Sequence, residues 1–203
     1  MRSNRLTNIA LVGAAIAIAA CAKEASNTTT DSAGGAMNAD SSAMMSDANA
    51  APAMTDANIA AYLDEVNIAD SSAGKLASTK GTSKAVRDFG LMMAGEHHAL
   101  RVEGLAVAKK GNITPAAASG DTTKQMAEHG MAKLTSTPKG AAWDKAYIDN
   151  EIAVHESVLE NATAASKATQ NADVKALIEK AAPIVQKHLD RAKEIQKTLT
   201  PST

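Results

Sequence analysis

The chain has 203 residues, of which 45% are hydrophobic and only 2% aromatic, and its formal net charge is −1. This length suits one ordinary domain together with a targeting segment. The nearly neutral charge and the few aromatic residues exclude a nucleic-acid-binding surface, which needs a basic stripe with aromatic side chains between the charges. The core must be built from aliphatic and small side chains, and their close packing favours a bundle of helices.

The first 20 residues predict a secretory signal peptide. Two arginines precede an apolar run from Ile9 to Ala20, whose 12 residues are too few to cross a bilayer. A membrane-spanning helix needs about 20 residues. The run leads into the sequence IAAC, which ends at Cys21 and resembles the bacterial lipoprotein signal. In that signal the cysteine is lipidated and becomes the new amino terminus.

Cys21 is the only cysteine of the chain, so an internal disulfide is impossible and lipidation is its simplest explanation. The alternative is an incidental cysteine after an ordinary signal peptide. Ala22 follows it, which resembles the default signal for delivery to the outer membrane of double-membraned bacteria. We therefore expect a lipoprotein whose partner is the membrane, on its periplasmic face, with the outer membrane as the first choice.

Residues 21–54 predict a disordered tether. Beyond Cys21 this segment has no Leu, Ile, Val or aromatic residue and consists mainly of Ala, Ser, Asn, Thr, Asp and Gly. Such a composition cannot bury enough apolar surface to offset the entropy of ordering the chain. The sequence thus predicts three parts: a signal peptide (1–20), an acylated cysteine with a tether (21–54) and a helical domain (55–200).

Apolar residues at spacings of three and four predict four long helices in this domain. Thr55 or Asp56 caps the first helix, which runs to about Lys80, and Ser83 caps the second, which reaches Lys110. The other two span about Ala141–Thr169 and Ala172–Leu199. The connection over residues 112–139 carries a short helical piece from about Thr122 to Leu134. It is long enough to carry the chain along a bundle, as in ferritin-like topologies. The predicted fold is an all-α ferritin-like four-helix bundle with this crossover.

Three of the long helices carry one histidine each on their apolar stripe, namely His97, His155 and His188. Counted from the turns, His155 and His188 differ in height by about 3 to 5 Å, and His97 lies at mid-height of its helix. The three imidazoles should therefore meet in the core. A buried polar group without a partner costs about 1 to 3 kcal/mol, so each ring needs a carboxylate, a backbone group or a metal.

Carboxylates lie near the same level: Asp70 on the first helix, Glu96 beside His97, and Glu151 one turn before His155. Inward-facing imidazoles and carboxylates from several helices bind iron or manganese in bundle proteins, and imidazole also suits zinc. The alternative is that each histidine is a satisfied core residue. The two other histidines, His98 and His129, fall off the apolar stripes and are expected at the surface.

Several pieces of the domain resemble a family catalogued as domain of unknown function 4142, a ferritin-like group of bacterial envelope proteins. The resemblance rests on Ala69-Asp70 with Gly74-Lys75-Leu76-Ala77, Val86-Arg87-Asp88-Phe89 with Met93 and Glu96-His97, Trp143-Asp144 with Tyr147 and His155, and Pro183 with His188-Leu189 and Ala192. The resemblance implies a ferritin-like bundle of unassigned activity, in which the family usually has a glutamate where this chain has Asp70.

Ferritin-like di-iron proteins carry Glu-x-x-His pairs, whereas the residues three before His97 and His188 are Ala94 and Val185. We therefore do not expect a two-metal oxidase. The predicted function is a lipid-anchored bundle that binds one iron, manganese or zinc ion. The predicted metal-site residues are His97, His155, His188, Glu151 and Asp70, and no catalytic residue is assigned. The alternative is a metal-free structural or partner-binding module of the cell envelope.

Overall fold

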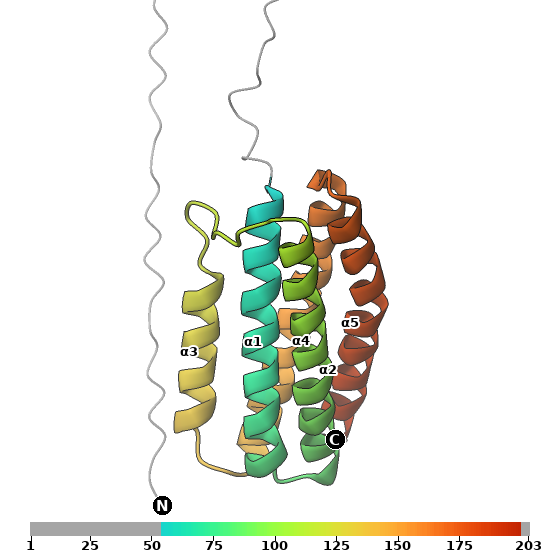
Figure 1. Ribbon diagram of the computed structural model, residues 1–203. Helices are drawn as coiled ribbons and strands as arrows, with labels where there is room; N and C mark the ends of the chain where they lie inside the picture. The colour runs from blue at the N-terminus through green and yellow to red at the C-terminus, as the bar shows by residue number, and fades with distance from the viewer. Residues whose placement is uncertain (1–53, 200–203) are drawn as a thin grey trace, which may run out of the picture. The chain divides into compact units, whose positions relative to one another are not determined.

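The computed structural model describes residues 54–199, which form five helices and no strand (Figure 1). The helices are α1 (Asp56–Lys80), α2 (Lys84–Lys110), α3 (Thr123–Ser136), α4 (Ala141–Ala168) and α5 (Ala172–Leu199). The prediction of an all-α chain with four long helices and one short helix is confirmed. The predicted signal peptide, Cys21 and the tether up to residue 53 lie outside the described residues. Within the described part, none of the helices combines the length and the apolar character that crossing a lipid bilayer requires.

Side chains at the helix ends explain why the helices begin where they do. The Thr55 hydroxyl accepts from the Asn58 N–H, and the Asn58 side chain accepts from the Thr55 N–H, which forms a reciprocal cap on α1. Ser83 caps α2 by accepting from the Val86 N–H at 3.1 Å. Asn171 accepts from two backbone N–H groups in the first turn of α5. These caps satisfy backbone donors that have no partner inside a helix.

The four long helices pack side by side, with neighbours running in opposite directions, and α3 covers one side against α1 and α4 (Figure 1). The connection from α2 to α4 carries the chain from one end of the domain to the other. At its start, Ala116 N–H donates to the carbonyl of Ala57 in the first turn of α1. At its end, Lys80 in the last turn of α1 donates to the carbonyl of Leu134 at 2.8 Å. As a result, α4 starts beside the α1–α2 turn.

Two glycines allow α1 and α2 to approach each other closely. A Cβ at Gly74 would lie 2.7 Å from the Gly90 carbonyl oxygen, and a Cβ at Gly90 would lie 2.7 Å from the Cβ of Ala77. Both distances are shorter than van der Waals contact, so only glycine fits at either position. This confirms the expectation that small residues set the helix spacing, and the close approach fixes the register of α1 against α2.

The largest apolar cluster lies at the end of the domain where α1 meets α2, and Trp143, Tyr147, Phe89, Met93 and Ile148 form its centre. All five side chains are at most 2% exposed. Most apolar positions that the helical spacing assigns to the core are buried, but the large side chains of Leu63, Leu76, Ile152, Leu159 and Ile184 are only half-buried. On α4, Ile148 and His155 are buried as predicted, whereas Glu151 instead of Ile152 fills the core position between them.

Candidate metal centre

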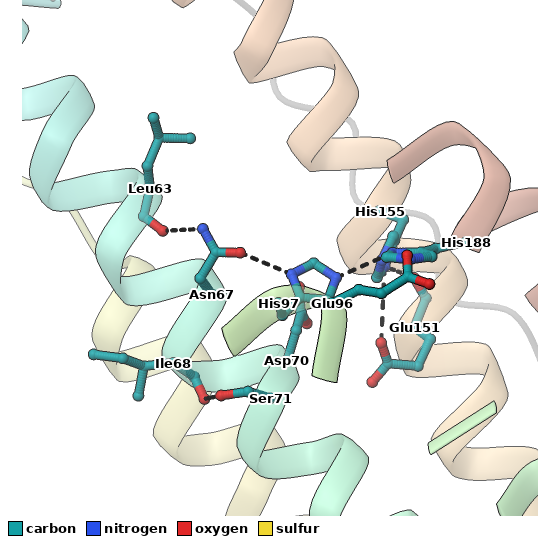
Figure 2. Close-up of polar contacts among 10 residues, drawn as sticks. All are labelled: Leu63, Asn67, Ile68, Asp70, Ser71, Glu96, His97, Glu151, His155 and His188. Atoms are coloured by element: carbon teal, nitrogen blue, oxygen red, sulfur yellow. Dashed lines mark hydrogen bonds and ion pairs between the residues drawn. The ribbon is translucent and has the colours of Figure 1, made fainter. Parts of the chain in front are cut away.

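Three histidines from three helices meet inside the domain, as their spacing predicted (Figure 2). His97 lies on α2, His155 on α4 and His188 on α5, and each side chain is at most 3% exposed. Their ring centroids are 5.0 to 5.5 Å apart. The ring of His155 is steeply inclined to both others, at 89° to His97 and 69° to His188, and the rings of His97 and His188 are tilted by 47°.

His97 is oriented by α1. Its Nδ1 lies 2.9 Å from the Oδ1 of Asn67, whose own Nδ2 donates to the Leu63 carbonyl at 2.7 Å. Because the amide nitrogen of Asn67 is engaged in this way, its oxygen faces the ring as an acceptor (Figure 2). Nδ1 of His97 therefore carries the hydrogen, and Nε2 of the neutral ring keeps its lone pair.

His188 is oriented by a carboxylate on α2. Its Nε2 lies 2.8 Å from Oε2 of Glu96, which is 41% exposed in its side chain. Since a carboxylate accepts hydrogen bonds, Nε2 of His188 carries the hydrogen. In the neutral ring the lone pair then lies on Nδ1, which faces the imidazole of His97.

His155 is oriented by its own helix. Its Nδ1 donates to the backbone carbonyl of Glu151 at 2.8 Å, so the lone pair lies on Nε2. That Nε2 is fully buried and has no hydrogen-bond partner in the described part of the chain. Each of the three rings thus gives its hydrogen to an outer acceptor and keeps one nitrogen lone pair for the interior.

The inner nitrogens of His97 and His188 lie at hydrogen-bonding distance. Nε2 of His97 and Nδ1 of His188 are 3.2 Å apart. The histidines can each offer one nitrogen such that the three atoms lie within 4.8 Å of one another. Two lone pairs at hydrogen-bonding distance repel each other unless a proton or a metal cation lies between them. The pair therefore fits either a proton shared by the two rings or a bound cation.

Two buried carboxyl groups extend this group towards α1 and α4. Asp70, Glu151 and His155 form a second set in which single ligand atoms lie within 4.8 Å of one another. Oδ2 of Asp70 and both carboxylate oxygens of Glu151 have no close hydrogen bond among the described residues, although Nδ1 of His155 lies 3.8 Å from Oε2 of Glu151 and the Asn150 side chain lowers the pKa of Glu151. Oδ2 of Asp70 lies 3.5 Å from Nδ1 of His97, which is beyond a good hydrogen bond.

Burial governs the protonation of these acids and bases. It raises the pKa of Asp70 to about 7, and it raises the pKa of Glu151 well above its usual range, with the charge of Asp70 adding to the effect. Burial lowers the pKa of His97 to about 2 and that of His155 to about 4, and repulsion between the imidazoles adds to both shifts. Without a metal the cluster therefore favours neutral groups.

All five predicted metal-site residues lie in this cluster. The sequence also placed Glu96 near this level, and the structure shows which ring it contacts. Asn67 was missed, because its link to His97 joins residues 30 positions apart and no local pattern announces it. The other two histidines, His98 and His129, are exposed, as predicted.

Comparisons with known proteins give a family but no activity. No curated protein and no solved structure matches the chain. The family model described as "Domain of unknown function (DUF4142)" matches residues 41–195, which is most of the chain and includes every residue of the imidazole and carboxylate cluster. The chain therefore belongs to the DUF4142 family.

Proposed function

We propose that this protein binds one divalent transition metal ion in its helical domain, through Nε2 of His97, Nε2 of His155 and Nδ1 of His188. The observation that supports the proposal is that the three histidines can each offer one nitrogen within 4.8 Å of the others, while an outer hydrogen bond engages one nitrogen of each ring. Histidines that ligate metals usually give their other ring N–H to a carboxylate, a backbone carbonyl or a similar acceptor. Asn67, Glu96 and the Glu151 carbonyl supply that arrangement here.

The carboxyl groups support the same proposal. Burying two acids without a cationic partner is costly in free energy, because burial removes their hydration and no close protein hydrogen bonds compensate for it. A divalent ion beside His155 would balance their charge, and Glu151 could complete its coordination shell while Asp70 acts from farther out. Three imidazoles with carboxylate oxygens suit zinc, iron or manganese. Because the residues three before His97 and His188 are Ala94 and Val185, we do not propose an oxygen-activating pair of metals.

We further propose that the domain is a ferritin-like bundle on a lipid-anchored envelope protein. The alternating direction of the long helices and the return of the chain through α3 support that topology. The IAAC sequence ending at Cys21 supports lipidation, with the domain on the periplasmic face of the outer membrane. Replacing Cys21 with serine should move the protein from the membrane fraction to the periplasmic fraction of a double-membraned host. Continued membrane association of this variant would contradict the anchor.

The metal proposal is tested on the full chain carrying Cys21→Ser, purified from metal-supplemented medium and analysed for bound metals. We expect about one equivalent of one metal, and a rise in melting temperature when zinc, iron(II) or manganese(II) is added to the stripped protein. His155→Ala should lower the affinity by more than about a hundredfold, since even outer hydrogen-bond partners of metal ligands contribute about 10 to 100-fold.

His98→Ala is the matched control, because it removes an exposed histidine from α2 and should leave metal binding unchanged. A stripped protein whose melting temperature does not respond to any of the three metals, together with no stoichiometric metal after purification, would overturn the proposal. That result would favour a metal-free structural module, with a shared proton between His97 and His188 and a charged His188 paired with Glu96.

A further inference from the structure

Charged side chains are distributed unevenly along the helical domain. At the end where α1 meets α2, the seven terminal residues of each helix, about two turns, together with the connecting segments carry nine lysines and arginines but only three acids, a formal charge of +6 (Figure 1). The opposite end, counted in the same way over residues 56–199, carries five basic and four acidic residues, a formal charge of +1. Because the whole chain has a net charge of −1, positive charge is concentrated at one end of the domain.

Five cations of this end form no ion pair in the described chain. We call them together the basic end: Lys80, Arg87, Lys133, Lys139 and Lys197. Lys133, Lys139 and Lys197 are exposed, and Lys80 and Arg87 are half-buried. Lys80, Arg87 and Lys139 donate to backbone carbonyls, whose partial charge does not neutralise a full positive charge. The basic end therefore presents unbalanced positive charge to the solvent.

Interactions at the helix ends explain the positions of these cations but not their excess. Lys80, Lys133 and Lys197 lie in the last turns of α1, α3 and α5, where a cation interacts favourably with the helix dipole. The first turn of α2 lies at the same end and would be stabilised by an acid, yet it has none and carries Lys84 and Arg87. At the opposite end, the first turns of α1 and α5 do contain an acid. Helix stability therefore does not require this excess of positive charge.

The shape of the basic end indicates the kind of partner that it fits. Its cations come from four helices and from the connection between α3 and α4, so they are spread over a surface and do not converge on one small anion. The aromatic side chains near this end, Phe89, Trp143 and Tyr147, are at most 2% exposed, so none can stack on a nucleic-acid base. The large apolar side chains that are exposed in the described chain lie outside these terminal turns. The surface therefore fits a layer of anionic groups that it contacts without insertion.

We propose that the basic end binds the surface of a membrane that contains anionic phospholipids, through contacts between its cations and the lipid headgroups. Clusters of about four to eight lysines and arginines are typical of proteins that bind such surfaces. At physiological ionic strength the Debye length is about 8 Å, so carboxylates farther along the domain are screened from a membrane at this end.

This contact is separate from the proposed lipid anchor and from the metal site. The basic end lies at the C-terminal end of α1, whose 25 residues span about 37 Å. The chain between Cys21 and the domain joins α1 at its other end. The inference depends neither on lipidation of Cys21 nor on a bound metal.

Vesicle binding tests the proposal on the full chain carrying Cys21→Ser, stripped of metal. Binding is measured by co-sedimentation with vesicles of phosphatidylcholine alone and of phosphatidylcholine with about 30% phosphatidylglycerol. We expect the anionic vesicles to bind more than about a hundredfold more tightly, and this preference to disappear in about 0.5 M NaCl, which shortens the Debye length. Equal affinity for the two kinds of vesicle, or a preference that salt does not reduce, would overturn the proposal.

Two triple variants with the same change in net charge locate the binding surface. The basic-end variant is Lys133→Gln, Lys139→Gln and Lys197→Gln, and the control variant at the opposite end is Lys109→Gln, Lys167→Gln and Lys175→Gln; all six lysines are exposed. Each lysine near an anionic surface contributes about fivefold, so the basic-end variant should bind anionic vesicles about a hundredfold more weakly. The control variant should stay within about threefold of the parent. The apolar run from Ile9 to Ala20 is common to all three proteins and cancels in the comparison.

Equal losses in the two folded variants, as judged by melting curves, would overturn the proposal, because the effect would then follow net charge and not the basic end. A DNA duplex at the same concentration of negative charge is the second probe. Tighter binding to this duplex than to the anionic vesicles would identify a soluble polyanion as the partner and overturn the membrane contact. His155→Ala should bind vesicles like the parent, so a failure of the metal proposal leaves this one intact.

Discussion

Two levels of the helical domain treat buried polar atoms differently. Near the α1–α2 turn, the Trp143 Nε1–H donates to the Leu134 carbonyl at 2.7 Å, and the buried carboxylate of Asp144 accepts from two backbone N–H groups at 2.7 Å. At the imidazole level, Nε2 of His155 and both carboxylate oxygens of Glu151 have no close hydrogen bond in the described chain, and the nearest cationic candidate for Glu151 is Nδ1 of His155 at 3.8 Å. The first level satisfies these polar atoms within the protein, although the buried hydroxyl of Tyr147 has no hydrogen-bond partner in the described chain, and the second leaves several polar atoms unsatisfied.

Tyr147 lies between these levels. Its ring stacks on Trp143 with centroids 5.6 Å apart, and it is completely buried. Burial raises the pKa of its hydroxyl well above the usual range, and the charges of Glu151 and Asp70 add to that effect. The apolar layer therefore stabilises the fold. The imidazole level lowers the free energy of unfolding, and a bound cation would raise it again.

The largest expected effect breaks the apolar layer. Trp143→Ala should lower the free energy of unfolding by about 3 to 5 kcal/mol, because it removes the largest buried side chain and the hydrogen bond to α3. Urea denaturation measures this change. Met126→Ala is the control, since a side chain that is 70% exposed should cost no more than about 0.5 kcal/mol. A loss below about 1 kcal/mol in Trp143→Ala would show that this layer does not carry the fold.

The next effect appears in the pH dependence of the metal-free protein. The folded pKa of Asp70, about 7, lies above its ordinary value of 3.8, so the folded state holds this proton more tightly than the unfolded state. Its contribution to stability is complete below about pH 4 and is lost as the pH rises towards 7, on the order of 1.4 kcal/mol per pH unit. Asp70→Asn removes this contribution.

The stability difference between parent and Asp70→Asn should therefore shift in favour of the variant as the pH rises from 4 to 7. Urea denaturation at several pH values measures it. Using the difference isolates Asp70 from the histidines, whose lowered pKa values act in the opposite direction and destabilise the folded state as the pH falls below about 6.5. A difference that stays constant across this range would contradict a raised pKa at Asp70.

A smaller effect tests the close contact between α1 and α2. Gly90→Ala should lower the free energy of unfolding by about 1 to 3 kcal/mol, because the new Cβ meets Ala77 and the α1 backbone. Gly95→Ala lies on the same helix with open space around it, and should raise stability by up to about 1 kcal/mol. Thermal melts of both variants give the signs. The same sign in both would mean that glycine spacing does not set the helix contact.

The smallest predicted effect sharpens the role of the outer hydrogen bonds at the imidazole level. Asn67→Ala should weaken metal binding by about 10 to 100-fold while the protein stays folded, because His97 loses the acceptor that orients it. Competition with a metal chelator measures the change. Asn161→Ala removes an amide that bonds Tyr62 instead, and should leave metal affinity unaltered. Equal affinities in the two variants would remove Asn67 from the site.

Local sequence signals predicted the helices well. Ser83 was expected to cap α2, and either Thr55 or Asp56 to cap α1; the Thr55 and Ser83 side chains accept the backbone hydrogen bonds. Such caps involve residues three apart, so the sequence itself displays both partners. The depth of the three imidazoles followed from counting along helices with a fixed rise per residue.

Tertiary partners were beyond that reasoning. Asp144 caps the start of α2 across more than 60 positions, and Asn67 orients His97 across 30. No regular spacing in the sequence predicts either of these hydrogen-bonded contacts. On α4, Glu151 is buried and Ile152 is half-buried. Which of these adjacent residues faces the core depends on how α4 packs against its neighbours. Hydrophobicity alone places Ile152 in the core, because it contains no information about the buried acids and imidazoles that surround Glu151.

The Leu134 carbonyl receives both the Lys80 ammonium from α1 and the Trp143 indole from α4, and so fastens one end of α3. The opposite end, near Thr123, borders a cavity between α3 and the face of α1 and α4. In the described chain this end makes no comparable hydrogen bond to α1 or α4. Thermal opening of α3 should therefore pivot about Leu134, and backbone amides should exchange with deuterium earlier around Met126 than around Leu134. In this motion the Thr123 end of α3 would move away from α1 and α4 while the Leu134 end stays in place.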